Sequence, residues 1–151
     1  MFNKQEAGIL KQQFWTRFGQ YMAPVPSAEG LKINWINYKT GVKDLQFTIQ
    51  ANNHHAVIAI MLMHADVARQ TAIFKQFEKW RHLLRDALQE EWQWEMQVTD
   101  ENNKTISRIY TQLNGVSLYR QQDWPAIISF FKPRLIALDQ FWSEVKYAFE
   151  V

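Results

Sequence analysis

The sequence contains no cysteine among its 151 residues. This absence excludes disulfide bonds, thiolate metal sites and a cysteine nucleophile, and it suits a reducing compartment. The longest uninterrupted apolar run covers only residues 56–63, whereas a membrane-spanning helix needs about 20 residues. The first residues, Met-Phe-Asn-Lys-Gln-Glu, lack the apolar stretch of a signal peptide. We therefore expect a cytoplasmic protein with no membrane partner.

Glycine and proline are scarce, with five and four copies respectively. Because the glycines are scattered, the chain has no phosphate-binding loop of the Walker or dinucleotide type. It also has no Gly-x-Ser-x-Gly nucleophile elbow. The net charge of +2 is too small to argue for nucleic-acid binding by itself. No motif indicates an enzyme class, and the sequence predicts no cofactor.

Aromatic residues are abundant, with seven Trp, ten Phe and five Tyr. Most of these side chains are expected to build the core, although Trp and Tyr are also enriched at interfaces and ligand sites. A chain of this length is the size of one ordinary domain and can bury a core without staples. We therefore expect a single domain over residues 1–151.

The chain repeats one pattern, in which a β-hairpin precedes a long amphipathic helix. Residues 45–52 alternate apolar and polar, and residues 57–63 return as an apolar strand. That strand is expected to be central and covered, at least in part, on both faces. Asp66 is an N-cap candidate for the helix that follows. The apolar stripe of this helix consists of Ile73, Phe77, Trp80, Leu84 and Leu88, and we expect Phe77, Trp80 and Leu84 to lie in the core.

The second half of the chain follows the same order. Residues 92–99 and 104–113 alternate as a second hairpin. The dipeptide Asn114-Gly115 is a strong turn signal, and residues 116–119 are expected to add a short third strand after it.

Helices are expected at both ends of the chain. Residues 3–22 predict the first, with an apolar face of Ile9, Leu10, Phe14, Phe18, Tyr21 and Met22. The last is expected to be capped by Asp123, to carry Pro125 in its first turn and to continue through Pro133 as one kinked helix. These elements predict an α+β fold: an antiparallel sheet of four to five strands from two hairpin–helix units, with an N-terminal helix, in two layers.

The connection over residues 23–44 is long for a compact domain, and such connections often carry function. Within it, Trp35, Tyr38, Lys39 and Lys43 bring aromatic rings and cations together. This combination suits the binding of nucleotides, peptides or single strands. The structural alternative is that Trp35 and Val42 fill the core while the lysines keep the loop soluble.

A basic helix face is the second candidate binding surface. It consists of Lys75, Lys79, Arg81 and Arg85. A stripe of this kind can contact phosphates. Interspersed carboxylates weaken that interpretation, and an ordinary solvated helix face is the alternative.

Asp44 and Glu95 are the nearest trace of a metal-dependent nuclease of the restriction-enzyme type. Such an enzyme needs an acidic residue on one strand and an acidic-x-Lys pair on the next, to hold a divalent cation. Here the lysine is missing and a helix intervenes. The four histidines lack metal-ligand spacing and are expected at turns and on the surface. The sequence therefore predicts no metal site and leaves the catalytic residues unassigned.

Several structural motifs resemble an uncharacterised bacterial family catalogued only as a domain of unknown function. They are Phe14-Trp15, Trp35, the Gly41-containing loop before an alternating strand, and Asp123-Trp124-Pro125. In longer members the domain follows a nuclease-like domain, so the resemblance implies a context related to nucleic acid. A second resemblance, in element order alone, is to the dimeric chaperones of type III secretion.

We expect a non-enzymatic interaction module, accessory to nucleic-acid processing, with a nucleic-acid or protein partner. The alternatives are a divergent metal-dependent nuclease and a peptide-binding dimer resembling secretion chaperones. A homodimer is expected because the last helix carries apolar residues off its main stripe, which a second copy would bury. These residues are Ile127, Phe130, Ile136 and Phe141. The rival explanation is that the first helix covers them within one chain.

Overall fold

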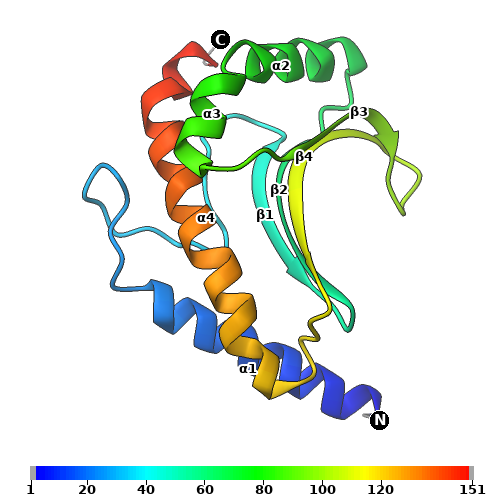
Figure 1. Cartoon of the computed structure of the whole chain (residues 1–151). Coiled ribbons are helices and arrows are strands. Elements are labelled where there is room, and N and C mark those ends of the chain that lie inside the picture. The colour runs from blue at the N-terminus through cyan, green and yellow to red at the C-terminus, as the bar shows by residue number, and fades with distance from the viewer. Residues whose placement is uncertain (1–2, 150–151) are drawn as a thin grey trace.

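A computed structural model describes residues 3–149 of the chain. Its elements are α1 (Lys4–Met22), β1 (Leu45–Ala51), β2 (His55–Leu62), α2 (Val67–Lys79), α3 (Arg81–Leu88), β3 (Gln93–Thr99), β4 (Thr105–Asn114) and α4 (Trp124–Val145), with short 3-10 turns at Gln121–Asp123 and Lys146–Ala148. The strands form one antiparallel sheet in the order β1-β2-β4-β3. The helices gather on one side of the curved sheet (Figure 1). The expected two-layer α+β fold is therefore confirmed.

Strand β2 is central, between β1 and β4, as its apolar sequence predicts. The side chains on its helix-facing side are all buried: Ala56, Ile58, Ile60 and Leu62. No described helix covers the opposite face of the sheet (Figure 1), yet the β2 side chains on that face are buried or half-buried, which agrees with the expected partial cover. On that face Val57 and Met61 are half-buried. Ala59 is buried there between its strand neighbours Thr48 and Tyr110.

The helical stripe after Asp66 forms two helices rather than one. The Asp66 carboxylate caps α2 as expected, accepting hydrogen bonds from the N–H groups of Ala68 and Arg69. The break falls at Trp80, whose φ of −101° and ψ of 16° leave the α-helical region. It allows α2 to pack on β3 and β4 while α3 packs on α4. Phe77 and Leu84 are buried as predicted, whereas Trp80 is only half-buried.

Helix α4 runs unbroken through Pro133, which confirms one helix rather than two. Pro133 is exposed. The carbonyl of the residue four positions earlier, which loses its helical partner, therefore lies on the solvent side, where water can satisfy it. At the start of the helix, Asp123 occupies the N-cap position but makes no capping bond. Its carboxylate instead accepts hydrogen bonds from the Ser117 N–H and the Arg120 guanidinium. These two bonds, that of Ser117 first, lower the pKa of Asp123.

The apolar residues off the α4 stripe are covered within one chain. Ile127, Phe130 and Phe141 are buried and Ile136 is half-buried. Helix α2 supplies part of the cover, because the Phe77 ring lies 6.4 Å from that of Phe141 between ring centroids. These residues are therefore covered within one chain, while α1 packs on the main stripe of α4 at Phe131. The homodimer stays a prediction without this support.

Two further expectations from the sequence are wrong. Residues 116–119 form no strand, because the chain turns at Gly115, whose φ is 79°, and leaves the sheet. The Leu118 side chain is instead buried in the core, and the Leu118 N–H donates to the Asn52 carbonyl. On α1, Ile9 and Tyr21 are about half exposed, at 50% and 51%, so the buried face is narrower than predicted.

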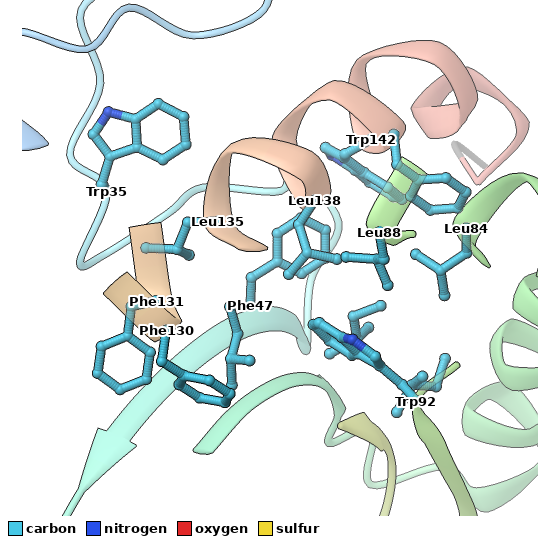
Figure 2. Close-up of a cluster of buried hydrophobic side chains, with 14 of the residues drawn as sticks. Trp35, Phe47, Leu84, Leu88, Trp92, Phe130, Phe131, Leu135, Leu138 and Trp142 are labelled. Atoms are coloured by element: carbon cyan, nitrogen blue, oxygen red, sulfur yellow. The ribbon is translucent and has the colours of Figure 1, made fainter. Parts of the chain in front are cut away.

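The core lies between the sheet and the helices, and Figure 2 shows side chains from both layers pointing into it. Trp92 lies beneath Leu84 and Leu88 of α3 in this view. Phe47 reaches up from β1, and its ring lies 5.8 Å from that of Trp142 on α4. The aromatic richness of the sequence is thus used mainly for packing.

Candidate functional site

The long connection between α1 and β1 is fastened to α4 by one buried carboxylate. Asp139 is 5% exposed and accepts hydrogen bonds from the Tyr38 hydroxyl at 2.6 Å and the Ala28 N–H at 2.7 Å. One turn further along α4, the Trp142 indole N–H donates to the Thr40 carbonyl at 2.8 Å. Three points of the connection are therefore held on the same helix.

Burial, the hydrogen bond to Asp139 and the negative charge of that carboxylate, in this order, raise the pKa of Tyr38 above that of an ordinary tyrosine. The phenol therefore stays protonated and remains a donor to Asp139. The donor side of this fastening therefore persists above the pH at which an ordinary tyrosine ionises.

A hollow of about 350 Å³ lies between this connection and α4. Its walls include Asn34, Asn37 and Lys39 from the connection and Asp139 and Trp142 from α4. Leu31 lines the hollow as well and is 60% exposed. A volume of this order suits a small ligand or the anchor side chain of a protein partner. We name it the α4 hollow.

The structure places the four sequence candidates of the loop in different roles. Trp35 is 3% exposed, and its indole N–H donates to the Val25 carbonyl. The Tyr38 ring stacks on Phe47, with centroids 5.1 Å apart. Because these ring faces are occupied, they form no open stacking platform for a nucleobase. Lys39 and Lys43 remain exposed.

The basic helix face is exposed on α2 and α3, and its four residues do not line the α4 hollow. Arg81 lies 3.5 Å from the Glu91 carboxylate. Arg85 lies 3.9 Å from both Asp86 and Glu91. Two of the four cations thus face carboxylates, which weakens this surface as a phosphate footprint. Their role in binding stays a prediction.

Asp44 and Glu95, the trace of a nuclease site, are not brought together. Asp44 precedes β1 at one edge of the sheet and Glu95 lies on β3 at the other. Three strand spacings of about 4.8 Å each separate the two edges, roughly 14 Å in all, which is too far for one shared cation. Glu95 is engaged instead by the Arg108 guanidinium at 2.6 Å. In residues 3–149 no cluster of three or more His, Asp or Glu could hold a metal ion.

His64 departs from the surface role that the sequence predicts. It is 7% exposed, and neither ring nitrogen has a hydrogen-bond partner in the described part of the chain. Burial lowers the pKa of this imidazole, although the nearby Asp44 carboxylate opposes the shift. The sequence feature that predicts this burial is the position of His64, directly after the apolar run of residues 56–63.

Buried polar contacts that no sequence pattern indicates lie beside His64. The Gln70 amide nitrogen donates to the carbonyls of His64 and Thr105, and its oxygen accepts from the Ser107 hydroxyl. Gln70 is fully buried. These bonds tie α2 to β4 and fix the turn that carries His64.

Comparison with known protein families identifies the family of this chain. Residues 10–146 match the family described as Domain of unknown function (DUF4268), and the chain belongs to this family. No curated protein and no solved structure matches it. The helices within residues 3–149 include no candidate for a membrane-spanning segment.

Proposed function

We propose that this domain is a non-enzymatic interaction module that binds a protein partner through the α4 hollow and its rim. The observation that carries the proposal is the combination of a fastened loop and an exposed anchor. Asp139 holds the loop in place, and Leu31 projects at the edge of the hollow with 60% of its surface exposed. Rigid loops that present an apolar side chain beside a pocket are typical of protein recognition.

A protein suits this surface better than a nucleic acid as the partner. The amides of Asn34 and Asn37 and the cation of Lys39 give the hollow mixed polarity rather than one dominant charge. The aromatic rings of the loop are packed inward. On the separate basic helix face, Arg81 and Arg85 already face carboxylates. An accessory role in nucleic-acid processing would then be exerted through a bound protein.

The test is site-specific photo-crosslinking in cells that produce the protein naturally. A photoreactive amino acid replaces Leu31 in one variant and Met96 in the other. Met96 on β3 is the matched control because it is also an exposed apolar residue, at 46%. We expect one protein to be crosslinked from position 31 and to be absent from position 96.

The captured protein is then purified and titrated against the domain by calorimetry. The Leu31→Asp variant should weaken binding at least tenfold, because a charge replaces the apolar anchor. A Met96→Asp variant should bind as the original chain does. Equal capture from both positions, or unchanged affinity in Leu31→Asp, would rule out this surface.

A further inference from the structure

Strand β1 forms an edge of the sheet with unpaired backbone groups. The Met63 N–H donates to the Asp44 carbonyl and the Asn52 N–H donates to the His55 carbonyl. Because an antiparallel ladder alternates, the even-numbered residues of β1 bond to β2 and the odd-numbered ones direct their N–H and C=O groups outward. These outward residues are Leu45, Phe47, Ile49 and Ala51.

The loop before β1 satisfies only the first of these residues. The Leu45 N–H donates to the Val42 carbonyl, and the Leu45 carbonyl accepts from the Thr40 hydroxyl at 2.8 Å. Within residues 3–149, the outward groups of Phe47, Ile49 and Ala51 have no hydrogen-bond partner. Three consecutive rungs of the ladder are therefore open to another strand.

A groove of about 530 Å³ runs along this edge. It is lined by loop residues 36–44 and strand residues 45–50. The strand itself carries no charge, no proline and no bulge, which are the usual devices that keep a second strand away from an edge. The sequence of the strand therefore offers no barrier to pairing.

The charge of the groove is positive. Lys39 and Lys43 line it and are exposed, and neither makes an ion pair in the described part of the chain. Asp44 is the one carboxylate among the lining residues. Cations beside open ladder positions favour an extended segment that carries carboxylates.

We propose that β1 receives an extended acidic peptide segment of a partner protein, which adds a fifth strand to the sheet. The backbone of the segment would pair with Phe47, Ile49 and Ala51, and its carboxylates would face Lys39 and Lys43. Main-chain hydrogen bonds then supply affinity and the lysines supply selectivity. This inference rests on the proposed function, since it names the chemistry of one segment of the partner.

Charge favours such a peptide over a second copy of the chain. Residues 45–51 hold no acidic side chain. The β1 strand of a second copy would therefore offer no carboxylate to Lys39 and Lys43.

The test uses a fluorescent peptide of seven residues that alternates valine and glutamate. Two comparison peptides are a valine–lysine version and a valine–glutamate version with N-methylated amides along one edge. We expect fluorescence anisotropy to show binding of the acidic peptide alone. Amide hydrogen exchange at Ile49 and Ala51 should slow when it binds, because these N–H groups gain partners.

Two double variants complete the test. Lys39→Gln with Lys43→Gln should weaken binding of the acidic peptide roughly fivefold or more, since two exposed ion pairs are lost. Lys75→Gln with Lys79→Gln is the matched control, because it removes two exposed lysines of α2 and should leave binding unchanged. All four positions are on the surface, so the variants are expected to fold.

Equal binding of the acidic and basic peptides, or full binding of the N-methylated peptide, would overturn the inference. So would a doubled mass in light scattering with slowed exchange at Ile49 before any peptide is added, because a second copy would then occupy the edge. A partner crosslinked from position 31 that coexists with failure of these peptides would leave the proposed function standing and refute this inference alone.

Discussion

The two hairpin–helix units of this chain have similar sequence patterns, but the continuity of their helices is the reverse of what their proline content predicts. In the first unit the helical stripe contains no proline, yet it breaks at Trp80. In the second, α4 contains Pro133 and stays continuous. The hairpins differ as well: β1 and β2 pair without irregularity, whereas β3 and β4 pair through a bulge between Glu95 and Val98.

The difference shows that packing partners decide where an element bends. The break after α2 serves two surfaces, the sheet for α2 and helix α4 for α3. The proline of α4 lies on the exposed side, where the lost hydrogen bond costs little. The bulge of β3 is held by the Gln97 N–H, which donates to the Ser107 hydroxyl. A bulge also protects an edge from other strands, and β1 lacks that protection.

The largest expected effect compares two neighbouring positions of the first helical stripe. Phe77→Ala should lower the free energy of unfolding by about 3–5 kcal/mol, because the side chain is fully buried. Trp80→Ala should cost less than half as much, because Trp80 sits at the break and is half-buried. Chemical denaturation followed by circular dichroism measures both. Equal losses would mean that Trp80 is as much a part of the core as Phe77.

Removing the proline of α4 should produce the next largest effect, with the opposite sign. Pro133→Ala should raise the free energy of unfolding by about 1–2 kcal/mol, since alanine restores a helical hydrogen bond. The gain is smaller than the full difference in helix propensity between proline and alanine, because alanine also increases the conformational entropy of the unfolded chain. Denaturant titration at constant m-value tests this. A loss of stability would show that Pro133 is required by its neighbours.

The bulge offers a test of similar magnitude on the second hairpin. Gln97 has a φ of 54°, in the left-handed region. Gln97→Val should cost about 1–2 kcal/mol because a β-branched residue is strained at positive φ. Gln97→Gly is the matched control: it also loses the side-chain bond to Thr71, seen at 2.6 Å, but relieves the backbone. Thermal melts that rank the two variants equally would assign the effect to the lost bond.

The last prediction concerns the pH dependence of the free energy of unfolding. It rests on His64, which lies in the turn after β2. Burial lowers the pKa of His64 in the folded state, relative to about 6.5 in the unfolded chain. As the pH falls below that value, the unfolded chain binds the proton first, so the stability contributed by neutral His64 is lost. Between pH 7.5 and 5.5 the original chain should therefore lose more stability than His64→Leu. The other three histidines are common to both proteins, and parallel slopes would contradict the prediction.

The sequence predicts the fold to a large extent, because period and position carry the information. The alternation in β1 and the apolar run of β2 define a central strand, and Asp66 marks a helix start that the structure confirms. The failures arise from contacts between distant segments. Trp80 fits the helical period, so only the positions of the sheet and α4 reveal the break.

The candidate site could be predicted only in part. The length of residues 23–44 and its mixture of lysines and aromatic residues make this segment a candidate for binding, and it lines both the α4 hollow and the groove beside β1. Asp139 was not identified, because an acidic residue on a helix is ordinarily solvated, and only the distant Tyr38 and Ala28 make it a buried acceptor. The open rungs of β1 likewise depend on the strand order, which residues 45–51 do not specify by themselves.

The attachment of the loop at Asp139 affects how this part of the molecule unfolds locally. One carboxylate holds two points of the connection that are ten residues apart, Ala28 and Tyr38. Releasing either point alone leaves a buried charge with fewer partners, so partial fraying is disfavoured relative to concerted release. The connection and the middle of α4 should therefore exchange their amide hydrogens as one cooperative unit. Because the same connection forms one wall of the groove beside β1, each such opening would also remove that wall of the groove.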